Sequence, residues 1–410
     1  MQHLLTQDGN AIRNYTEAVH LGAYDRPPDG LSGKYDNVRR FWEDAATSHA
    51  LSEFLTPLLE QKRAELSRLR VLDLGCGSGA GYEYVSATAG HAMVGYYKGV
   101  DINDAMVEKA RQLYSDDSKC CFILGDLNDG LPIDDDEPNY DLIFSSYASL
   151  SHLGDESLEQ LLERICRQMG NQVILVADLL GRYSYEWPCY WDTADESETM
   201  HTYSMSYIYP PDLRDQVAIE RFPSRFWGGA EFDRFVDKIA DRCHVSISRR
   251  KLCDRSILVG RHMDTQEFNP CAPSLRSLVN SLYEPLRRTD LNQLLFDYHH
   301  YGTNPVINDF FDRYQMAWNV VVATVMDELM MPFDETAATL PSFAYTEPVQ
   351  HIIKQLRWSI RIANEAHGED LIADWIEPQL ARSLFRLEQE MQQGLGVGHG
   401  LLAYYELRRG

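Results

Sequence analysis

The chain has 410 residues, of which 44% are hydrophobic, so at about 150 residues per domain it can form two or three domains with a sizeable core. Its 62 Asp and Glu residues outnumber its 38 Lys and Arg residues, and the formal net charge of −24 disfavours a nucleic acid or an anionic membrane as a partner. The apolar stretches are far shorter than the roughly 20 residues that span a bilayer, which predicts that the chain has no membrane span.

The eight cysteines and the N-terminal residues predict the cellular compartment of the protein. The cysteines are too sparse for a disulfide framework, and they form neither a CxxC pair nor a zinc-type set with histidine. The first 20 residues lack a basic segment followed by an apolar core, which a secretory signal would need. We therefore expect reduced thiols, no metal site and a cytoplasmic location.

The central part of the chain alternates between strands and helices. Helical periodicity covers 36–69, and from Arg70 onward short apolar strands are separated by helical stretches. The strands are predicted over 70–75, 93–102, 120–126, 140–146 and 172–180. Because these strands show little polar spacing, the pattern predicts an α/β fold with a Rossmann-like, doubly wound, mostly parallel sheet. Two β-rich runs, 244–252 and 256–263, predict an antiparallel hairpin at one edge.

Two segments interrupt or follow this alternation. The first, 181–229, is rich in Tyr and Trp, and a connection of that length is typical of a functional lid. The second, 265–410, has helical periodicity and is predicted to be a helical domain or cap beside a domain over 1–264. Its run 306–330 is apolar on most sides, which is typical of core burial in the cap but also of a homodimer interface.

The sequence VLDLGCGSGAG carries the clearest chemical signal. It places Asp73 before four glycines that alternate from Gly75 to Gly81, where a strand passes into a helix. Glycines there let the backbone turn tightly and approach a ligand closely. Gly75, Gly77 and Ala80 also satisfy the dinucleotide pattern, so spacing alone leaves a nicotinamide enzyme open. The Asp73 carboxylate favours a ligand with an ammonium or sulfonium group over a pyrophosphate.

VLDLGCGSG resembles the first motif of class I S-adenosylmethionine-dependent methyltransferases, and three further matches follow in order. GVDIND places Asp101 where the resemblance implies an acid that accepts both ribose hydroxyls. GDLND falls where the family holds adenine, and YDLIFSSYASLSHL falls beside the methyl donor. The resemblance covers about residues 70–180. It implies that S-adenosylmethionine is the cofactor and contacts Asp73, Gly75, Cys76, Gly77, Gly79, Asp101, Ile102, Asp126, Leu127, Ser145 and Ser146.

The implied reaction is methyl transfer to a small-molecule acceptor, through an amine, hydroxyl or carboxyl group. In-line displacement from a sulfonium needs alignment and exclusion of water, and a base assists if the acceptor carries a proton. The candidate catalytic residues are Tyr147, which is expected to line the methyl site, His152, Asp178 and Glu186. His152 and Asp178 have alternative roles in packing and in binding backbone amides. The aromatic insert could pack over the sheet edge or stabilise a cation through its ring faces.

Two other functions remain open on the sequence. An enzyme could use the sulfonium without moving the methyl group, by cyclising the donor's side chain or by transferring its aminocarboxypropyl group, and release methylthioadenosine. The domain could also bind the cofactor as a non-catalytic regulatory subunit. The large cap favours a sequestered small molecule over a protein surface as the acceptor.

Overall fold

The computed structural model describes residues 35–410 except 135, 193–199, 331–345 and 366–367, together with residues 16, 19, 22 and 24. The first 20 residues, where no secretory signal is predicted, lie almost entirely outside this part. A π-helical turn, Arg39–Glu43, leads into helix α2, Asp44–Ala64. The apolar residues of α2 are buried at the predicted helical spacing, but the helix ends at Ala64 rather than at Leu69, which begins the first strand.

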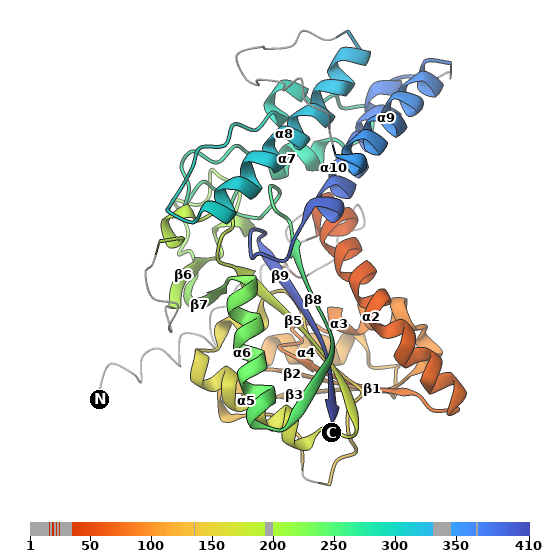
Figure 1. The fold of residues 1–410 in the computed structure, drawn as a ribbon, viewed down its shortest axis with the longest axis vertical. Helices are drawn as coiled ribbons and strands as arrows, with labels where there is room; N and C mark the ends of the chain where they lie inside the picture. The colour runs from red at the N-terminus through yellow and green to blue at the C-terminus, as the bar shows by residue number, and fades with distance from the viewer. Residues whose placement is uncertain are drawn as a thin grey trace.

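Five parallel strands form the body of the sheet, in the order β3-β2-β1-β4-β5 (Figure 1). Their bounds are Leu69–Leu74 for β1, Val94–Asp101 for β2, Cys120–Leu124 for β3, Leu142–Ser145 for β4 and Gln172–Gly181 for β5. The helices between and after them are α3 (Ala80–Ala89), α4 (Asp104–Leu113), α5 (Asp155–Gln168) and α6 (Gly229–Arg242). The predicted Rossmann-like parallel sheet is therefore confirmed.

The antiparallel edge of the sheet is formed by a different pair of segments from the predicted hairpin. Strand β8 spans Val245–Arg255, but 256–263 is not a strand. Instead the C-terminal strand β9, Gly400–Arg409, lies between β5 and β8 and runs antiparallel to both. Successive residues of β9 enter the hydrophobic cores on opposite faces of the sheet, so the strand is apolar on both sides and suits an interior position.

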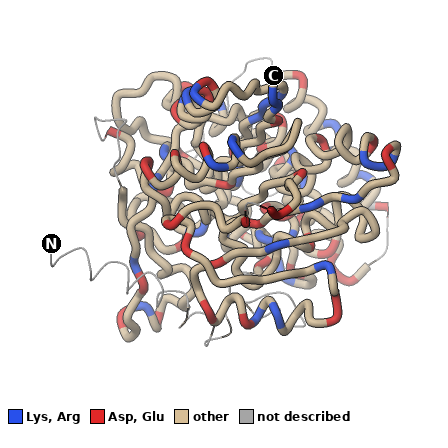
Figure 2. The backbone as a smooth tube through the Cα atoms, turned by 90° about the horizontal axis from the view of Figure 1, so that it is seen from below, with Lys and Arg blue, Asp and Glu red and all other residues tan. Residues whose placement is uncertain are grey.

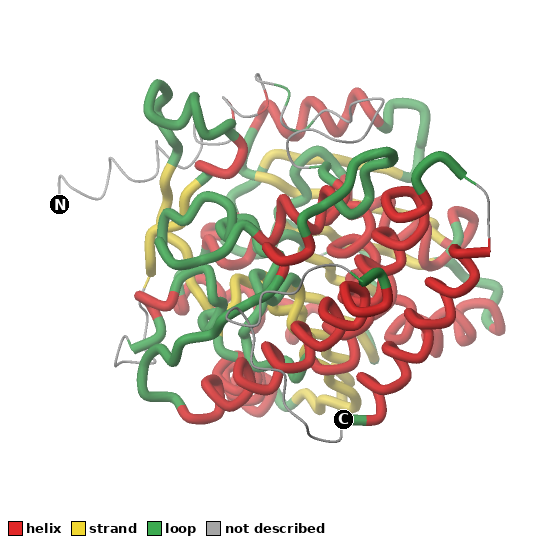
Figure 3. Tube along the Cα trace, turned by 90° about the horizontal axis from the view of Figure 1, so that it is seen from above, coloured by secondary structure: helices red, strands yellow, loops and turns green. Residues whose placement is uncertain are grey.

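The helical region is therefore an insertion between the last two strands of the sheet, and the predicted division at residue 264 misassigns 400–409. The insertion comprises α7 (Leu275–Ser281), α8 (Pro305–Glu328), α9 (Glu347–Glu365), a π-helical turn (Ile372–Ile376) and α10 (Glu377–Met391). Seen from above, these helices lie in front of the strands (Figure 3). Most of α8 is buried, in a core that the insertion shares with residues such as Trp42 and Trp191 outside it, and the predicted homodimer stays a prediction.

The aromatic insert contains a short antiparallel hairpin of β6 (Met200–Ser204) and β7 (Arg221–Trp227). β7 continues the sheet, because its last residues pair in parallel with the end of β5. Trp187, Phe226 and Trp227 are buried, so much of the aromatic density serves packing over the sheet edge. Residues 193–199 of the insert lie outside the described part.

Charge is spread over the molecule. In Figure 2 acidic and basic positions are interspersed along the trace of the described residues. Within that same part of the chain, no helix combines the length and apolar character needed to cross a bilayer.

Candidate active site

The glycine loop after β1 turns through the left-handed region of backbone space. Gly75, Gly77 and Gly79 have φ values of +74°, +52° and +90°, which a residue with a Cβ atom adopts only with strain. The N–H of Gly77 donates to Oδ2 of Asp101 over 2.8 Å, so the first two motifs meet at the ends of β1 and β2. Burial raises the pKa of Asp101, against the opposing effect of the N–H groups of Asn103 and Gly77.

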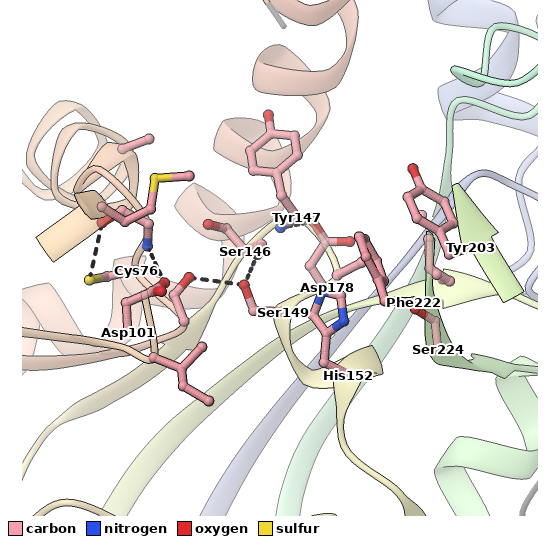
Figure 4. Close-up of a pocket in the computed structure, with 18 of the residues that line it drawn as sticks. Cys76, Asp101, Ser146, Tyr147, Ser149, His152, Asp178, Tyr203, Phe222 and Ser224 are labelled. Carbon is pink, nitrogen blue, oxygen red and sulfur yellow. Dashed lines mark hydrogen bonds between the residues drawn. The ribbon is translucent and has the colours of Figure 1, made fainter. Parts of the chain in front are cut away.

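A cavity of about 280 Å³ opens at the carboxyl ends of the parallel strands. Most of the predicted site residues line it, namely Gly75, Cys76, Gly77, Asp101, Ile102, Asp126, Leu127, Ser146, Tyr147, His152 and Asp178. Figure 4 shows Cys76 and Asp101 at one end, Ser146 and Tyr147 in the middle, and Tyr203, Phe222 and Ser224 at the other end. The cavity thus extends from the glycine loop to the β6–β7 hairpin.

Three predicted cofactor residues do not line this cavity. Ser145 is the fully buried last residue of β4, and Gly79 faces the rings of Tyr114 and Phe122. Asp73 lies behind the loop, where it accepts a hydrogen bond from Tyr97. Burial raises the pKa of Asp73 to about 7, so this group is only partly ionised at neutral pH. The interpretation that Asp73 faces a ligand cation is therefore corrected, because its side chain points into the core.

Tyr147 and Asp178 are joined at the centre of the cavity. The N–H of Tyr147 donates to Oδ2 of Asp178 over 2.6 Å, and Arg255 pairs with the same oxygen over 2.8 Å. The guanidinium of Arg39 lies 3.2 Å from the centre of the Tyr147 ring. Burial raises the pKa of Tyr147 well above its ordinary value, although Arg39 opposes the shift. Tyr147 therefore stays a neutral phenol at neutral pH and is not suited to be a base.

Glu186, predicted as a catalytic residue, lies behind the cavity wall and holds a histidine that the sequence did not reveal. Its Oε2 is 2.7 Å from Nδ1 of His399, and its Oε1 accepts the N–H of His262. Burial alone would raise the pKa of Glu186, but His399 and His262 outweigh it and bring that pKa below its ordinary value. A carboxylate beside Nδ1 of His399 favours a proton on that nitrogen, and Nε2 lies on the cavity side, 3.4 Å from the hydroxyl of Tyr203.

The loop before β9 brings His399 into the cavity wall. Asp254 at the end of β8 accepts the N–H groups of Leu395, Gly396 and Val397 over 2.7 to 2.9 Å. The loop packs so closely on the start of α6 that a Cβ atom on Gly229 would lie 1.7 Å from a backbone oxygen of Gly394. No sequence spacing predicts this position, because Glu186 and His399 are 213 residues apart. The only local signal is a histidine among glycines just before an apolar run.

A buried network of charged side chains borders the cavity at Arg261. Arg261, just after β8, donates to Oε2 of Glu43 over 2.9 Å, and Arg276 donates to Oε1 of the same carboxylate over 2.7 Å. Burial alone would raise the pKa of Glu43, but Arg261 and Arg276 outweigh it and hold that pKa well below its ordinary value. Among the described residues, no three His, Cys, Asp or Glu side chains form a group that could hold a metal ion.

Residues 71–171 match the family model of a methyltransferase domain. The chain therefore contains a methyltransferase domain. The match covers the strands that carry the glycine loop, Asp101, Asp126 and Tyr147. It ends before the aromatic insert, the helical insertion and β9.

Individual proteins resemble this methyltransferase domain more distantly. The hybrid PKS-NRPS synthetase poxE of Penicillium oxalicum is 29% identical over 145 residues, which are 34% of this chain and 4% of that protein. Thus the match spans only a small part of that protein's length. The CcbJ methyltransferase of Streptomyces caelestis is 16% identical, with 59% of this chain and 89% of that chain covered and a TM-score of 0.36. An S-adenosylmethionine-dependent methyltransferase of Clostridium acetobutylicum is 14% identical, with 58% and 90% covered and a TM-score of 0.35.

The cavity residues fit S-adenosylmethionine, the cofactor that the resemblance of the sequence motifs implies. The position of a Cβ atom on Gly77 meets nothing within 4 Å, so the loop leaves open space beside its backbone. The Asp101 carboxylate offers acceptors that suit a vicinal diol. Oδ1 of Asp178 is buried and has no hydrogen-bond partner in the described part of the chain. Such an unsatisfied carboxylate oxygen fits the positive charge of the cofactor.

Proposed function

We propose that the protein transfers the methyl group of S-adenosylmethionine to a small-molecule acceptor held between Tyr147 and His399. The observation that carries this proposal is that one cavity joins the glycine loop and Asp101 to His399, a histidine backed by a buried carboxylate. A donor site and a base in the same cavity are what transfer to a protonated acceptor needs.

The roles of the residues follow from their positions. We assign the glycine loop to the methionine part of the cofactor, Asp101 to its ribose, and Asp126 and Leu127 to its adenine. The bound cofactor supplies an electrophilic methyl group on a sulfonium. Tyr147 and Asp178 are hydrogen-bonded to each other and form the wall at the middle of the cavity. Nε2 of His399 takes the proton from the acceptor. The β6–β7 hairpin covers this end of the cavity and excludes water, which strengthens electrostatic interactions inside it.

The test of this function follows the fate of two labels. The protein is incubated with S-adenosylmethionine labelled on the methyl group or on the carboxyl group, with panels of phenols, amines and acids. We expect the methyl label to move to an acceptor and the carboxyl label to stay in S-adenosylhomocysteine. Release of methylthioadenosine would favour the non-methylating chemistry, and cofactor binding without turnover on any panel would favour a regulatory subunit.

Replacing Asp101 tests the cofactor assignment. We expect Asp101→Ala to weaken S-adenosylhomocysteine binding by about 1.5 to 3 kcal/mol, because hydrogen bonds to a charged group are lost. Isothermal titration calorimetry measures this change. Asp104→Ala is the matched control, since Asp104 is exposed at the start of α4 and does not line the cavity. Equal affinities of the two variants would remove Asp101 from the cofactor site.

A further inference from the structure

Arg261 lines the end of the cavity that the cofactor motifs do not explain. Arg261 lines the cavity and is only 6% exposed. Within the described chain its guanidinium makes a single hydrogen bond, to Glu43, which is few for a buried arginine. A guanidinium carries five N–H donors in a planar fork. Most of its donor capacity therefore remains for a molecule in the cavity.

The carboxylate that balances Arg261 lies outside the cavity lining. Glu43 is buried behind Arg261 and is shared with Arg276, which also forms two hydrogen bonds to Asp36 at 2.8 Å. These bonds anchor Arg261 from behind. The cavity therefore meets a positive group that is already held in place, and such preorganisation lowers the entropy cost of binding an anion.

Arg261 and Arg39 line different parts of the cavity wall. Arg39 lies against Tyr147 and donates to the hydroxyl of Tyr84 on α3, so it is on the side of the glycine loop. We assign Arg39 to the carboxylate of the cofactor's methionine part. Arg261 lies 5.1 Å from the ring centre of Tyr207, on the side of the aromatic insert. Its free donors are therefore available to the acceptor.

Aromatic rings connect Arg261 to the proposed base. The ring of Tyr207 is 6.4 Å from that of Tyr203, and the hydroxyl of Tyr203 is 3.4 Å from Nε2 of His399. Phe222 packs on Tyr203, with 5.6 Å between ring centres, and also lines the cavity. The acceptor end thus has a cation on one side, a histidine on the other and ring faces between them, an arrangement that fits a flat acid.

We propose that the acceptor is a small aromatic acid, whose carboxylate binds Arg261 and whose hydroxyl group reacts beside His399. This inference rests on the proposed methyl transfer. As the new O–CH₃ bond forms, the acceptor's O–H bond breaks and its proton passes to Nε2 of His399. The bond between the methyl carbon and sulfur breaks, and its electron pair stays on sulfur as a neutral thioether. The carboxylate of the acceptor contributes to binding and is not methylated.

The test compares two probes that differ only in the acid group, 4-hydroxybenzoate and 4-hydroxybenzamide. Binding of S-adenosylhomocysteine is measured first by calorimetry, and its absence would contradict the methyltransferase function itself. With S-adenosylhomocysteine saturating, we expect the wild-type protein to bind the benzoate about tenfold more tightly than the benzamide. Equal affinities, or no binding of either probe, would overturn the aromatic-acid inference while the cofactor result stands.

Variants of Arg261 test whether this residue causes the preference for the benzoate. We expect Arg261→Gln to reduce the preference for the benzoate to within about twofold, while Arg261→Lys keeps part of it because the charge remains without the planar fork. Arg221→Gln is the matched control, since Arg221 begins β7, is 49% exposed and pairs with Glu267 at the surface. If Arg261→Gln still preferred the benzoate about tenfold, Arg261 would not be the residue that binds the carboxylate. If that variant does not fold, the comparison of probes on the wild-type protein still decides the inference.

Discussion

We expect His399→Ala to lower the turnover number for methyl transfer by about 10²-fold to 10⁴-fold, the usual contribution of a general base. The affinity for S-adenosylhomocysteine should change by less than about twofold, because His399 lies at the acceptor end of the cavity. Steady-state kinetics and calorimetry on the same preparations measure the two quantities. His351→Ala, on the exposed face of α9, is the control.

The acceptor itself offers a second readout for His399. An acceptor whose hydroxyl is already ionised at the assay pH needs no base, so the loss in His399→Ala should shrink for such acceptors. Glu186→Gln keeps the shape of its side chain but removes the charge that holds the His399 proton on Nδ1, and we expect an intermediate loss. An equal loss for ionised and protonated acceptors would indicate that His399 acts in positioning and not in proton transfer.

We expect Glu43→Gln to lower the free energy of unfolding by about 3 to 5 kcal/mol, because Arg261 and Arg276 would lose the buried anion that they share. Chemical denaturation followed by intrinsic fluorescence measures this change. Glu53→Gln is the matched control. Its salt bridge to Lys251 spans 2.6 Å, but the side chain of Glu53 is 53% exposed, so we expect a cost below about 1 kcal/mol.

The pH dependence of the Glu43 effect has a defined sign. The pKa of Glu43 in the folded protein is well below the value of 4.5 for an unperturbed glutamate. Its contribution to stability is therefore complete above pH 4.5 and is lost as the pH falls toward the folded-state pKa. We expect the stabilities of the wild type and Glu43→Gln to differ by a constant amount at neutral pH and to converge in acid. A gap that widens in acid would contradict an ionised Glu43.

The sequence predicted the parallel sheet and the glycine-loop end of the cavity because their signals are local. Each strand of the β3-β2-β1-β4-β5 order is a short apolar run, and Asp101, Asp126 and Tyr147 lie at the end of such a run or within two residues of it. Parallel strands bring their carboxyl ends to one edge, so Asp101, Asp126 and Tyr147 had to meet near the glycine loop. Asp73 was misplaced because its side chain points toward Tyr97 and not toward the loop's outer side.

The acceptor end could not be predicted in this way. His399 and Glu186 meet across 213 residues, and Arg261 and Glu43 meet across 218 residues. Neither pair has a fixed spacing or motif. Their meeting depends on β9, which returns from the C-terminus to lie between β5 and β8 after the whole helical insertion. The periodicity of 400–409 is compatible with a strand, but it does not identify the two strands that this segment joins.

The sequence by itself thus determined the class of fold and the motifs at the donor end, since hydrophobic periodicity and glycine conformations act over a few residues. Only the tertiary structure decided where β9 pairs and which charged groups line the acceptor end. The physical reason is that strand pairing and buried ion pairs are selected by the packing of the whole chain. The combination of His399, Glu186 and Arg261 therefore exists only once the sheet is complete.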